Sequence, residues 1–358
     1  MTDTEHLVLA KATLDPTSKS YRYLRSMSIP QEKLSIALNK QYKCSNSIIT
    51  TSGTDAIYTL INGIHMINSF KPLNFIISDQ VYSSTPKIFS QYIATFAPNS
   101  TLTFINITEP NTIIETFTTN LNQDNILFIE SCSNPLGYIF DHTIIPQLRS
   151  LSKTLTIITD NTWLTEIIYN PFSHDTDFVI LSLTKYYSAG NAIAGAILSN
   201  DTESMKKISL FRRITGHHIS PDTCSIILKH MLNITHRIIK SSELTIATIN
   251  HFDQHPKIKS IIHPSLSHHV SHHLISYLVY MPSVFCIILQ SDIKKSQLSK
   301  KLKKCEIFDL KTSFGYKTSR FDPYIFKIEG LPCIRISIGY KDSMEKIIAG
   351  ITELLDMV

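Results

Sequence analysis

Residues 177–185 read Asp-Phe-Val-Ile-Leu-Ser-Leu-Thr-Lys, and this stretch decides the predicted fold. Its apolar run predicts a buried strand that leads directly to Lys185. Partial burial disfavours a charged ammonium group, so we expect a neutral amine that could attack a carbonyl group. The hydroxyl groups of Ser182 and Thr184 lie just before this lysine and could bind an anion such as a phosphate.

A second apolar and β-branched stretch, residues 155–162, reads Leu-Thr-Ile-Ile-Thr-Asp-Asn-Thr and predicts a strand that ends near Asp160. An aspartate and a lysine at the ends of neighbouring parallel strands face the same crevice. Such a pair suits pyridoxal phosphate (PLP), because the lysine can bind the aldehyde and the aspartate can keep the ring nitrogen protonated. The alternative is an ordinary pair of charged residues at the surface.

Composition indicates a globular chain rather than a disordered one. Of its residues 43% are hydrophobic and 18% are charged, as is typical of folded proteins. The length of 358 residues is sufficient for two or more domains with a large core. The apolar runs are too short to span a bilayer, and the polar N-terminus has no signal-peptide pattern. Six scattered cysteines without a CxxC motif favour neither zinc nor disulfides, so we expect a cytoplasmic protein.

The formal charge of +5 is mild, and the basic run at residues 294–304 is interpreted as a solvated helix face. We therefore expect neither a nucleic-acid partner nor a membrane partner. Histidines cluster at residues 263–273, where His269 and His273 have the i, i+4 spacing of some zinc sites. No acid of the HExxH type accompanies them, so we expect a histidine-rich loop and no metal.

The two strand-end motifs, Asp160-Asn161-Thr162-Trp163 and Ser182-Leu183-Thr184-Lys185, resemble the Cys/Met metabolism family of PLP-dependent enzymes, the cystathionine synthases and lyases and their relatives. The resemblance covers roughly residues 20–355. It implies the PLP-dependent transferase fold of type I, an α/β fold with a mostly parallel seven-stranded sheet, helices on both faces, and a smaller α+β C-terminal domain. The alternation of strands and helical patterns over residues 44–228 also indicates a mostly parallel sheet.

Three domains are expected from this resemblance. Residues 1–43 would form an arm that contributes to a neighbouring subunit, 44–228 the PLP-binding domain and 229–358 the C-terminal domain. One long helix is predicted from Ser220 towards His251, because apolar residues recur there at helical spacing. The family assembles as dimers or tetramers with shared active sites, so a homo-oligomer is expected.

Residues 48–57 predict a strand, a glycine turn and a helix, whose free N-terminal N–H groups could hold a phosphate. An ordinary serine N-cap is the alternative. The resemblance implies that Ser52, Gly53 and Thr54 form the phosphate cradle, with Thr54 in place of the methionine of the family. It also implies that Tyr23 and Arg25 reach the phosphate of a neighbouring subunit.

Other roles are likewise implied by the resemblance. Tyr82 would stack on the cofactor ring and transfer protons, and Asn134 and Glu130 would line the pocket. Ser313 would help to hold the substrate carboxylate. Arg335 lies within an apolar strand, where a bidentate clamp on an α-carboxylate would justify its burial; a structural ion pair is the alternative.

The function implied by the resemblance is sulfur amino acid metabolism: β- or γ-elimination on cystathionine or a similar thioether amino acid. Lys185, Tyr82 and Asp160 would be catalytic. The runner-up is γ-replacement on an acylated homoserine, as in cystathionine γ-synthases or O-acetylhomoserine sulfhydrylases. A third possibility, a PLP-binding homologue without activity, arises from departures in this chain. These are the altered loop at Asn191, Tyr316 in place of a glycine and Thr318 in place of a glutamate.

Overall fold

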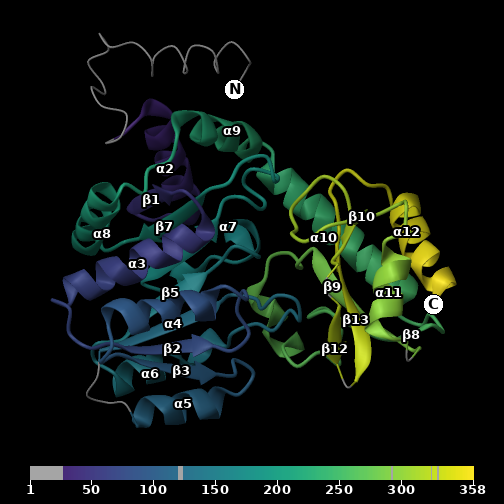
Figure 1. Ribbon diagram of the computed structural model, residues 1–358, viewed down its shortest axis with the longest axis horizontal. Helices are drawn as coiled ribbons and strands as arrows, with labels where there is room; N and C mark the ends of the chain where they lie inside the picture. The colour runs from purple at the N-terminus through teal and green to yellow at the C-terminus, as the bar shows by residue number, and fades with distance from the viewer. Residues whose placement is uncertain (1–26, 120–123, 292, 324, 329) are drawn as a thin grey trace. The chain divides into compact units, whose positions relative to one another are not determined.

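The computed structural model describes residues 27–119, 124–291, 293–323, 325–328 and 330–358. Contacts divide the chain into two compact units (Figure 1). The first ends at Leu232 and the second begins at Asn233, but Ser133–Ile139 also group with the second unit. The boundary predicted from the sequence, between residues 228 and 229, lies four residues earlier and does not assign Ser133–Ile139 to the second unit. The role of residues 1–43 as an arm to another subunit stays a prediction.

A seven-stranded sheet forms the centre of the first unit. Its strands are β1 (Asn46–Thr50), β2 (Asn74–Ser78), β3 (Thr101–Ile105), β4 (Asn125–Glu130), β5 (Thr156–Asp160), β6 (Phe178–Ser182) and β7 (Gly195–Ser199). The strand order is β1-β7-β6-β5-β4-β2-β3. The β3–β2, β2–β4, β4–β5 and β5–β6 pairs are parallel, whereas β7 is antiparallel to β6 and β1. The prediction of a mostly parallel seven-stranded sheet is therefore confirmed.

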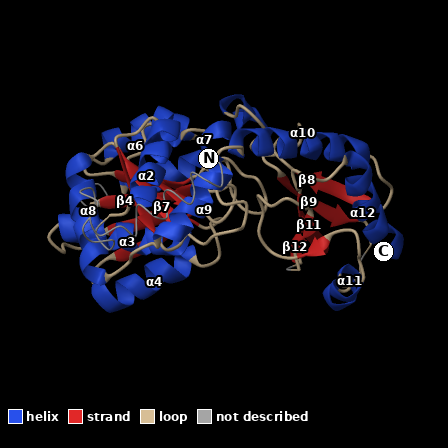
Figure 2. Ribbon diagram, turned by 90° about the horizontal axis from the view of Figure 1, so that it is seen from above, coloured by secondary structure: helices blue, strands red, loops and turns tan. Residues whose placement is uncertain are grey.

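Helices lie on both sides of these strands (Figure 2). They are α2 (Ile29–Tyr42), α3 (Gly53–Ile67), α4 (Thr85–Phe96), α5 (Pro110–Thr118), α6 (Ile145–Leu151), α7 (Thr165–Ile168), α8 (Thr202–Thr215) and α9 (Pro221–Met231), with the 3-10 turns η1 (His142–Ile144) and η2 (Pro171–His174). Because both faces of the sheet are covered, every residue of β2 and β4 is buried, and their central residues form apolar runs rather than an alternating pattern.

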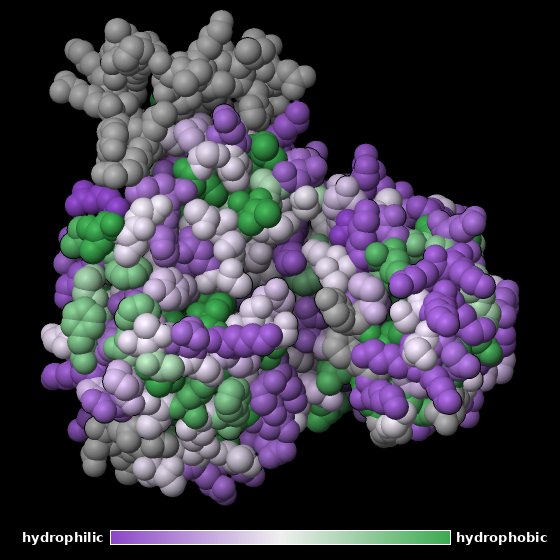
Figure 3. Space-filling view, in the orientation of Figure 1, coloured by the Kyte–Doolittle hydropathy of each residue, from purple (hydrophilic) through white to green (hydrophobic). Residues whose placement is uncertain are grey.

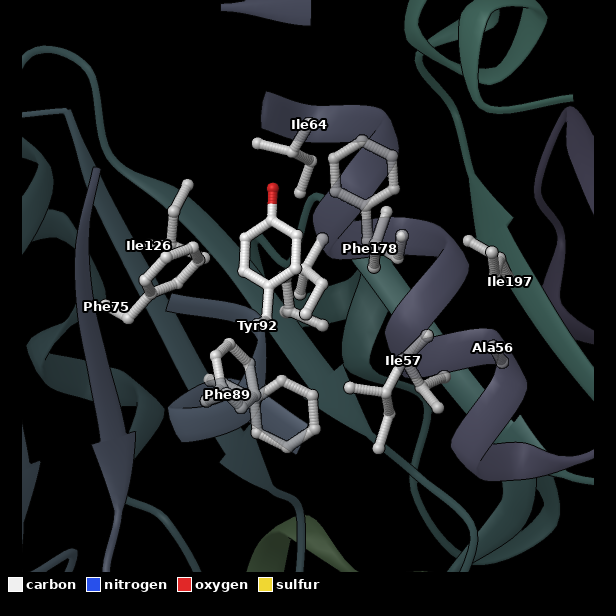
Figure 4. Close-up of a cluster of buried hydrophobic side chains, with 14 of the residues drawn as sticks. Ala56, Ile57, Ile64, Phe75, Phe89, Tyr92, Ile126, Phe178 and Ile197 are labelled. Atoms are coloured by element: carbon white, nitrogen blue, oxygen red, sulfur yellow. The ribbon is translucent and has the colours of Figure 1, made fainter. Parts of the chain in front are cut away.

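Aliphatic and aromatic side chains together fill the core between the sheet, α3 and α4 (Figure 4). Phe89 lies edge-on to Phe75, with ring centroids 5.2 Å apart, and edge-on to Phe128 at 5.4 Å. Tyr92 is buried beside them, and its hydroxyl forms a 2.6 Å hydrogen bond with Nδ1 of His65. This packing fixes α3 against the sheet, and the N-terminus of α3 matters for the site described below.

The second unit contains a smaller, six-stranded sheet with the order β10-β11-β13-β9-β8, and β12 also pairs with β13. Its elements are α10 (Ile234–Phe252), β8 (Ile258–Ile262), η3 (His272–Tyr277), β9 (Val284–Leu289), α11 (Lys295–Leu302), β10 (Asp309–Leu310), β11 (Arg320–Phe321), β12 (Phe326–Ile328), β13 (Leu331–Ser337) and α12 (Met344–Met357). Buried residues of this sheet, α10, α11 and α12 share one apolar core. The predicted α+β C-terminal architecture is thus confirmed.

The chain between the two units forms two helices instead of one. The predicted single helix over residues 220–251 is wrong, because α9 ends at Met231, α10 begins at Ile234 and Asn233 between them has ψ of 18°. The break lies where the chain passes from one unit to the other.

Hydrophilic side chains dominate the visible surface around α11 and α12, and the basic run includes α11 (Figure 3). No helix within the described ranges is both long and apolar enough to cross a membrane.

Candidate active site

Three adjacent parallel strands end at the same edge of the large sheet. β4 ends at Glu130, β5 at Asp160 and β6 at Ser182. Glu130 is opposite Asp160 in the strand register, and Asp160 is opposite Ile180. The chain turns after β6, where the Lys185 N–H donates to the Ser182 carbonyl at 3.3 Å. The structure therefore brings the predicted strand-end residues to one edge.

The charge of Lys185 acts on the carboxylate of Asp160. Burial raises the pKa of Asp160 to about 6, while hydrogen bonds from Thr162 and the positive charge of Lys185 lower it. The Thr162 N–H donates to Asp160 Oδ1 at 2.9 Å. A carboxylate that titrates close to neutral pH is stabilised in its charged form by a further nearby cation. The protonated ring nitrogen of PLP is such a cation.

The N-terminus of α3 packs directly against the end of β6. A Cβ atom added at Gly53 would lie 2.9 Å from Ser182 Cβ, so only glycine permits this approach. Ser52 is the N-cap, and its Oγ accepts the Asp55 N–H at 3.0 Å. The first N–H groups of a helix have no acceptor within the helix and attract anions. The N-terminal N–H groups of α3 and the neighbouring Ser182 hydroxyl are suitable donors for a phosphate group, and we call this site the phosphate cradle.

The close approach of β7 supports the same cradle. A Cβ atom added at Gly195 would lie 2.1 Å from the Ser52 carbonyl oxygen, which forces a glycine at the start of β7. The Ser52 and Thr54 hydroxyl groups are 2.9 Å apart. The backbone of the cradle is therefore held on two sides, by β6 and by β7.

Thr184 contacts the loop that departs from the family pattern. Its hydroxyl accepts the Ala194 N–H at 3.2 Å and is 3.3 Å from the Ala194 carbonyl oxygen. Ser188 Oγ closes the same loop by donating to the carbonyl groups of Thr184 and Ala192, each at 3.0 Å. The loop turns through left-handed backbone at Ala189 and Gly190. The role of Thr184 as a phosphate ligand stays a prediction.

Tyr82 and Glu130 are joined through the backbone. The Tyr82 N–H donates to Glu130 Oε1 at 2.6 Å, and the Glu130 side chain is buried. The Tyr82 side chain is 49% exposed, so its ring is accessible to a ligand. Glu130 thus holds the turn that carries Tyr82, a contact that sequence reasoning did not identify.

Two of the predicted substrate residues, Arg335 and Ser313, lie within the second unit, whereas Glu130 belongs to the first. Arg335 Nη1 donates to Asn134 Oδ1 at 2.8 Å, and Arg335 Nη2 forms an ion pair with Asp322 Oδ2. Ser313 has left-handed backbone, with φ of 88°, and its carbonyl oxygen accepts the Ser337 hydroxyl at 3.3 Å. Tyr23 and Arg25 lie outside the residues that the structure describes.

Asn161 connects several segments beneath the strand-end edge. Its Oδ1 is 2.5 Å from Ser131 Oγ, and its Nδ2 donates to the Tyr42 hydroxyl at 3.1 Å and to the Tyr169 carbonyl at 2.8 Å. Thr162 Oγ1 accepts the Ser182 N–H at 2.7 Å. Asn161 and Thr162 belong to the motif on which the resemblance rests, but no role was predicted for them from the sequence. A polar residue directly after the aspartate at the end of a buried strand could have indicated the role of Asn161.

The histidine-rich loop is held by backbone contacts. Four of its imidazoles form hydrogen bonds with backbone carbonyl oxygens, namely His263 with Pro282, His268 with Ile261, His269 with Leu136 and His272 with Pro264. Within the ranges that the structure covers, no group of three or more His, Cys, Asp or Glu residues could hold a metal ion.

Known proteins with similar sequences and structures carry the names of trans-sulfuration enzymes. The cystathionine gamma-lyase of Dictyostelium discoideum is 23% identical over 319 residues, which are 88% of this chain and 80% of that protein. The cystathionine beta-lyase of Coxiella burnetii is 24% identical over 287 residues, 79% of this chain and 72% of that protein.

A solved structure shares the fold over the whole chain. The cystathionine gamma synthase from Xanthomonas oryzae pv. oryzae, in complex with cystathionine, has a TM-score of 0.83 at 19% identity and covers 100% of this chain and 98% of its own. The model of the family described as Cys/Met metabolism PLP-dependent enzyme matches residues 4–358. The resemblance seen in the sequence is confirmed: the chain belongs to the Cys/Met metabolism family of PLP-dependent enzymes, and pyridoxal phosphate is its cofactor.

Proposed function

We propose that this enzyme cleaves the C–S bond of cystathionine or a similar thioether amino acid by β- or γ-elimination. The main support is the strand-end edge of the first unit, which carries Asp160, Ser182 and Lys185 and where Ser182 packs against the N-terminus of α3. The two similar sequences described above are named as lyases, which favours elimination.

The residues that would hold PLP follow from the geometry of the first unit. The N–H groups of Gly53 and Thr54 and the hydroxyl of Ser182 would bind the phosphate, and Asp160 would bind the protonated ring nitrogen. Lys185 would hold the cofactor covalently. When bound, PLP supplies an electron sink for the bonds of the substrate α-carbon.

The remaining steps are proton transfers and binding by this chain's own residues. The freed Lys185 amine takes the proton from the substrate α-carbon. The Tyr82 hydroxyl gives a proton to the departing sulfur, which suits an exposed ring on a turn held by Glu130. Arg335 binds the α-carboxylate of the substrate, and Asn134 orients its guanidinium.

A second candidate is γ-replacement on an acylated homoserine. The Asn191 loop, which is closed by Thr184 and Ser188, resembles that of homoserine sulfhydrylases, and the structural relative described above is a gamma synthase. We further propose a cytoplasmic homo-oligomer, a dimer or tetramer in which Tyr23 and Arg25 reach the phosphate of a neighbouring subunit.

Two substrate incubations separate these reactions. With cystathionine, β-elimination releases pyruvate and homocysteine, whereas γ-elimination releases 2-oxobutyrate and cysteine. With O-acetylhomoserine and sulfide, γ-replacement releases homocysteine. Formation of a keto acid from cystathionine supports elimination, and homocysteine formed only from O-acetylhomoserine and sulfide refutes it in favour of replacement.

The role of Lys185 is tested by Lys185→Ala. The purified variant is expected to lose the visible absorption of the linked cofactor and the cofactor-sized mass increase of the Lys185 peptide after borohydride reduction. Lys207→Ala, which removes an exposed lysine of α8, is the control and should retain both. Retention of both signals in Lys185→Ala would contradict the assignment.

A further inference from the structure

Arg335 and Asp322 face each other across two neighbouring strands of the small sheet. The antiparallel register pairs Phe321 of β11 with Ile336 of β13, and the Asp322 N–H donates to the Arg335 carbonyl at 3.0 Å. Directly opposite residues in an antiparallel pair place their side chains on the same face. The ion pair between Asp322 and Arg335 is therefore built into the sheet.

This ion pair is almost completely removed from water. The side chains of Arg335 and Asp322 are only 8% and 4% exposed. Asn134 engages the guanidinium at its other terminal nitrogen, and Cys286 is the residue opposite Arg335 on β9. A charge pair in such surroundings is screened much less by water and salt than a surface pair.

A guanidinium has five N–H groups, and one contact to Asn134 and one to Asp322 leave N–H groups for another acceptor. A substrate carboxylate could thus still bind Arg335. However, it would then lie close to the carboxylate of Asp322, and two like charges at such a distance repel each other strongly when partly buried. The net charge that this face offers a substrate carboxylate is near zero rather than positive.

We propose that Asp322 is a specificity-determining residue, an internal carboxylate with which the α-carboxylate of the substrate competes for Arg335. Asp322 weakens the binding of amino acids that carry a free carboxylate, relative to the corresponding carboxamides. This inference rests on the proposed function, in which Arg335 binds the α-carboxylate.

The test measures the binding of L-alanine and L-alaninamide to the holoenzyme by calorimetry, since neither ligand has a leaving group. Asp322→Asn keeps the shape of the side chain and removes its charge. The affinity for L-alanine is expected to rise roughly tenfold, because one nearby like charge is removed, while that for L-alaninamide changes little. Asp322→Glu restores the charge and should restore the weak binding of L-alanine.

The matched control is Asp342→Asn. Asp342 is also buried in the second unit, but it pairs with Lys346 at 2.8 Å and accepts the Ser319 N–H at 2.6 Å. Its loss should leave the ratio of the two affinities unchanged. Thermal denaturation of each variant shows whether it is folded; if Asp322→Asn does not fold, Asp322→Glu and Asp322→Ser provide the comparison of charged and neutral side chains.

Two results would overturn the proposal. Weaker binding of L-alanine to Asp322→Asn would show that Asp322 only orients Arg335, and an equal change for both ligands would show a purely structural ion pair. Arg335→Gln, which removes the positive charge, separates this failure from that of the proposed function. If Arg335→Gln binds L-alanine as tightly as the wild type, Arg335 does not bind the carboxylate; if it binds L-alanine more weakly while Asp322→Asn gains nothing, only the present inference fails.

Discussion

Gly53→Ala is expected to weaken PLP binding by pushing the N-terminus of α3 away from β6. The added Cβ would lie 2.9 Å from Ser182 Cβ and 3.2 Å from Ser182 Cα, so the helix or the strand must shift by a few tenths of an ångström. Overpacking of this kind costs about 1–3 kcal/mol, and the better helix propensity of alanine returns about 0.5–1 kcal/mol. The expected net loss of stability is thus about 0–2.5 kcal/mol.

The loss in cofactor affinity should exceed what the stability loss alone would cause. The helix N–H groups and the Ser182 hydroxyl no longer converge on one phosphate, so we expect a fall in PLP affinity of roughly tenfold or more, equal to about 1.4 kcal/mol. The assay is a fluorescence titration of the apoprotein with PLP, with urea unfolding of the same samples.

Gly63→Ala is the matched control, because it overpacks the same helix away from the cradle. Its added Cβ would lie 2.6 Å from Ile208 Cγ1, so a comparable loss of stability is expected with little change in PLP affinity. The reasoning is refuted if Gly53→Ala binds PLP as tightly as Gly63→Ala at similar stability.

Two other predictions concern stability. Burial raises the pKa of Asp160 to about 6, so its ionisation destabilises the apoprotein as pH rises above about 4. Asp160→Asn should therefore stabilise the apoprotein by up to about 3 kcal/mol at pH 8 and by less at pH 5, as measured by urea unfolding; an equal gain at both pH values contradicts this. His269→Ala removes the 2.9 Å bond to the Leu136 carbonyl, which should cost about 1–3 kcal/mol and speed proteolysis at residues 133–139. His268→Ala, at an exposed position, should do neither, and equal effects of the two variants would refute the anchoring role of His269.

His269 also shows how a hydrogen-bond network assigns a role that sequence spacing does not. Its Nδ1 accepts the Ser271 N–H at 3.1 Å, so the neutral ring carries its proton on Nε2 and donates it to the Leu136 carbonyl. The i, i+4 spacing to His273 occurs in some zinc sites, although no metal was predicted here. The ring instead fixes the segment that carries Asn134.

The sequence by itself determined the mostly parallel large sheet and the places of Asp160, at the end of β5, and of Lys185, shortly after the end of β6. Both follow from local patterns, because a strand buried on both faces must be apolar along its length, and a charged residue marks its end. The family membership also followed from short motifs, since these keep their order and spacing along the chain.

Only the tertiary structure decided the surroundings of Arg335. The pairing of its buried guanidinium with a protein carboxylate could not be read from residues 331–337. This pairing depends on the register of β11 and β13, which places Asp322 opposite Arg335. The grouping of Ser133–Ile139 with the second unit could not be read from the sequence for the same reason. It depends on contacts between residues far apart in the sequence, which no local pattern records.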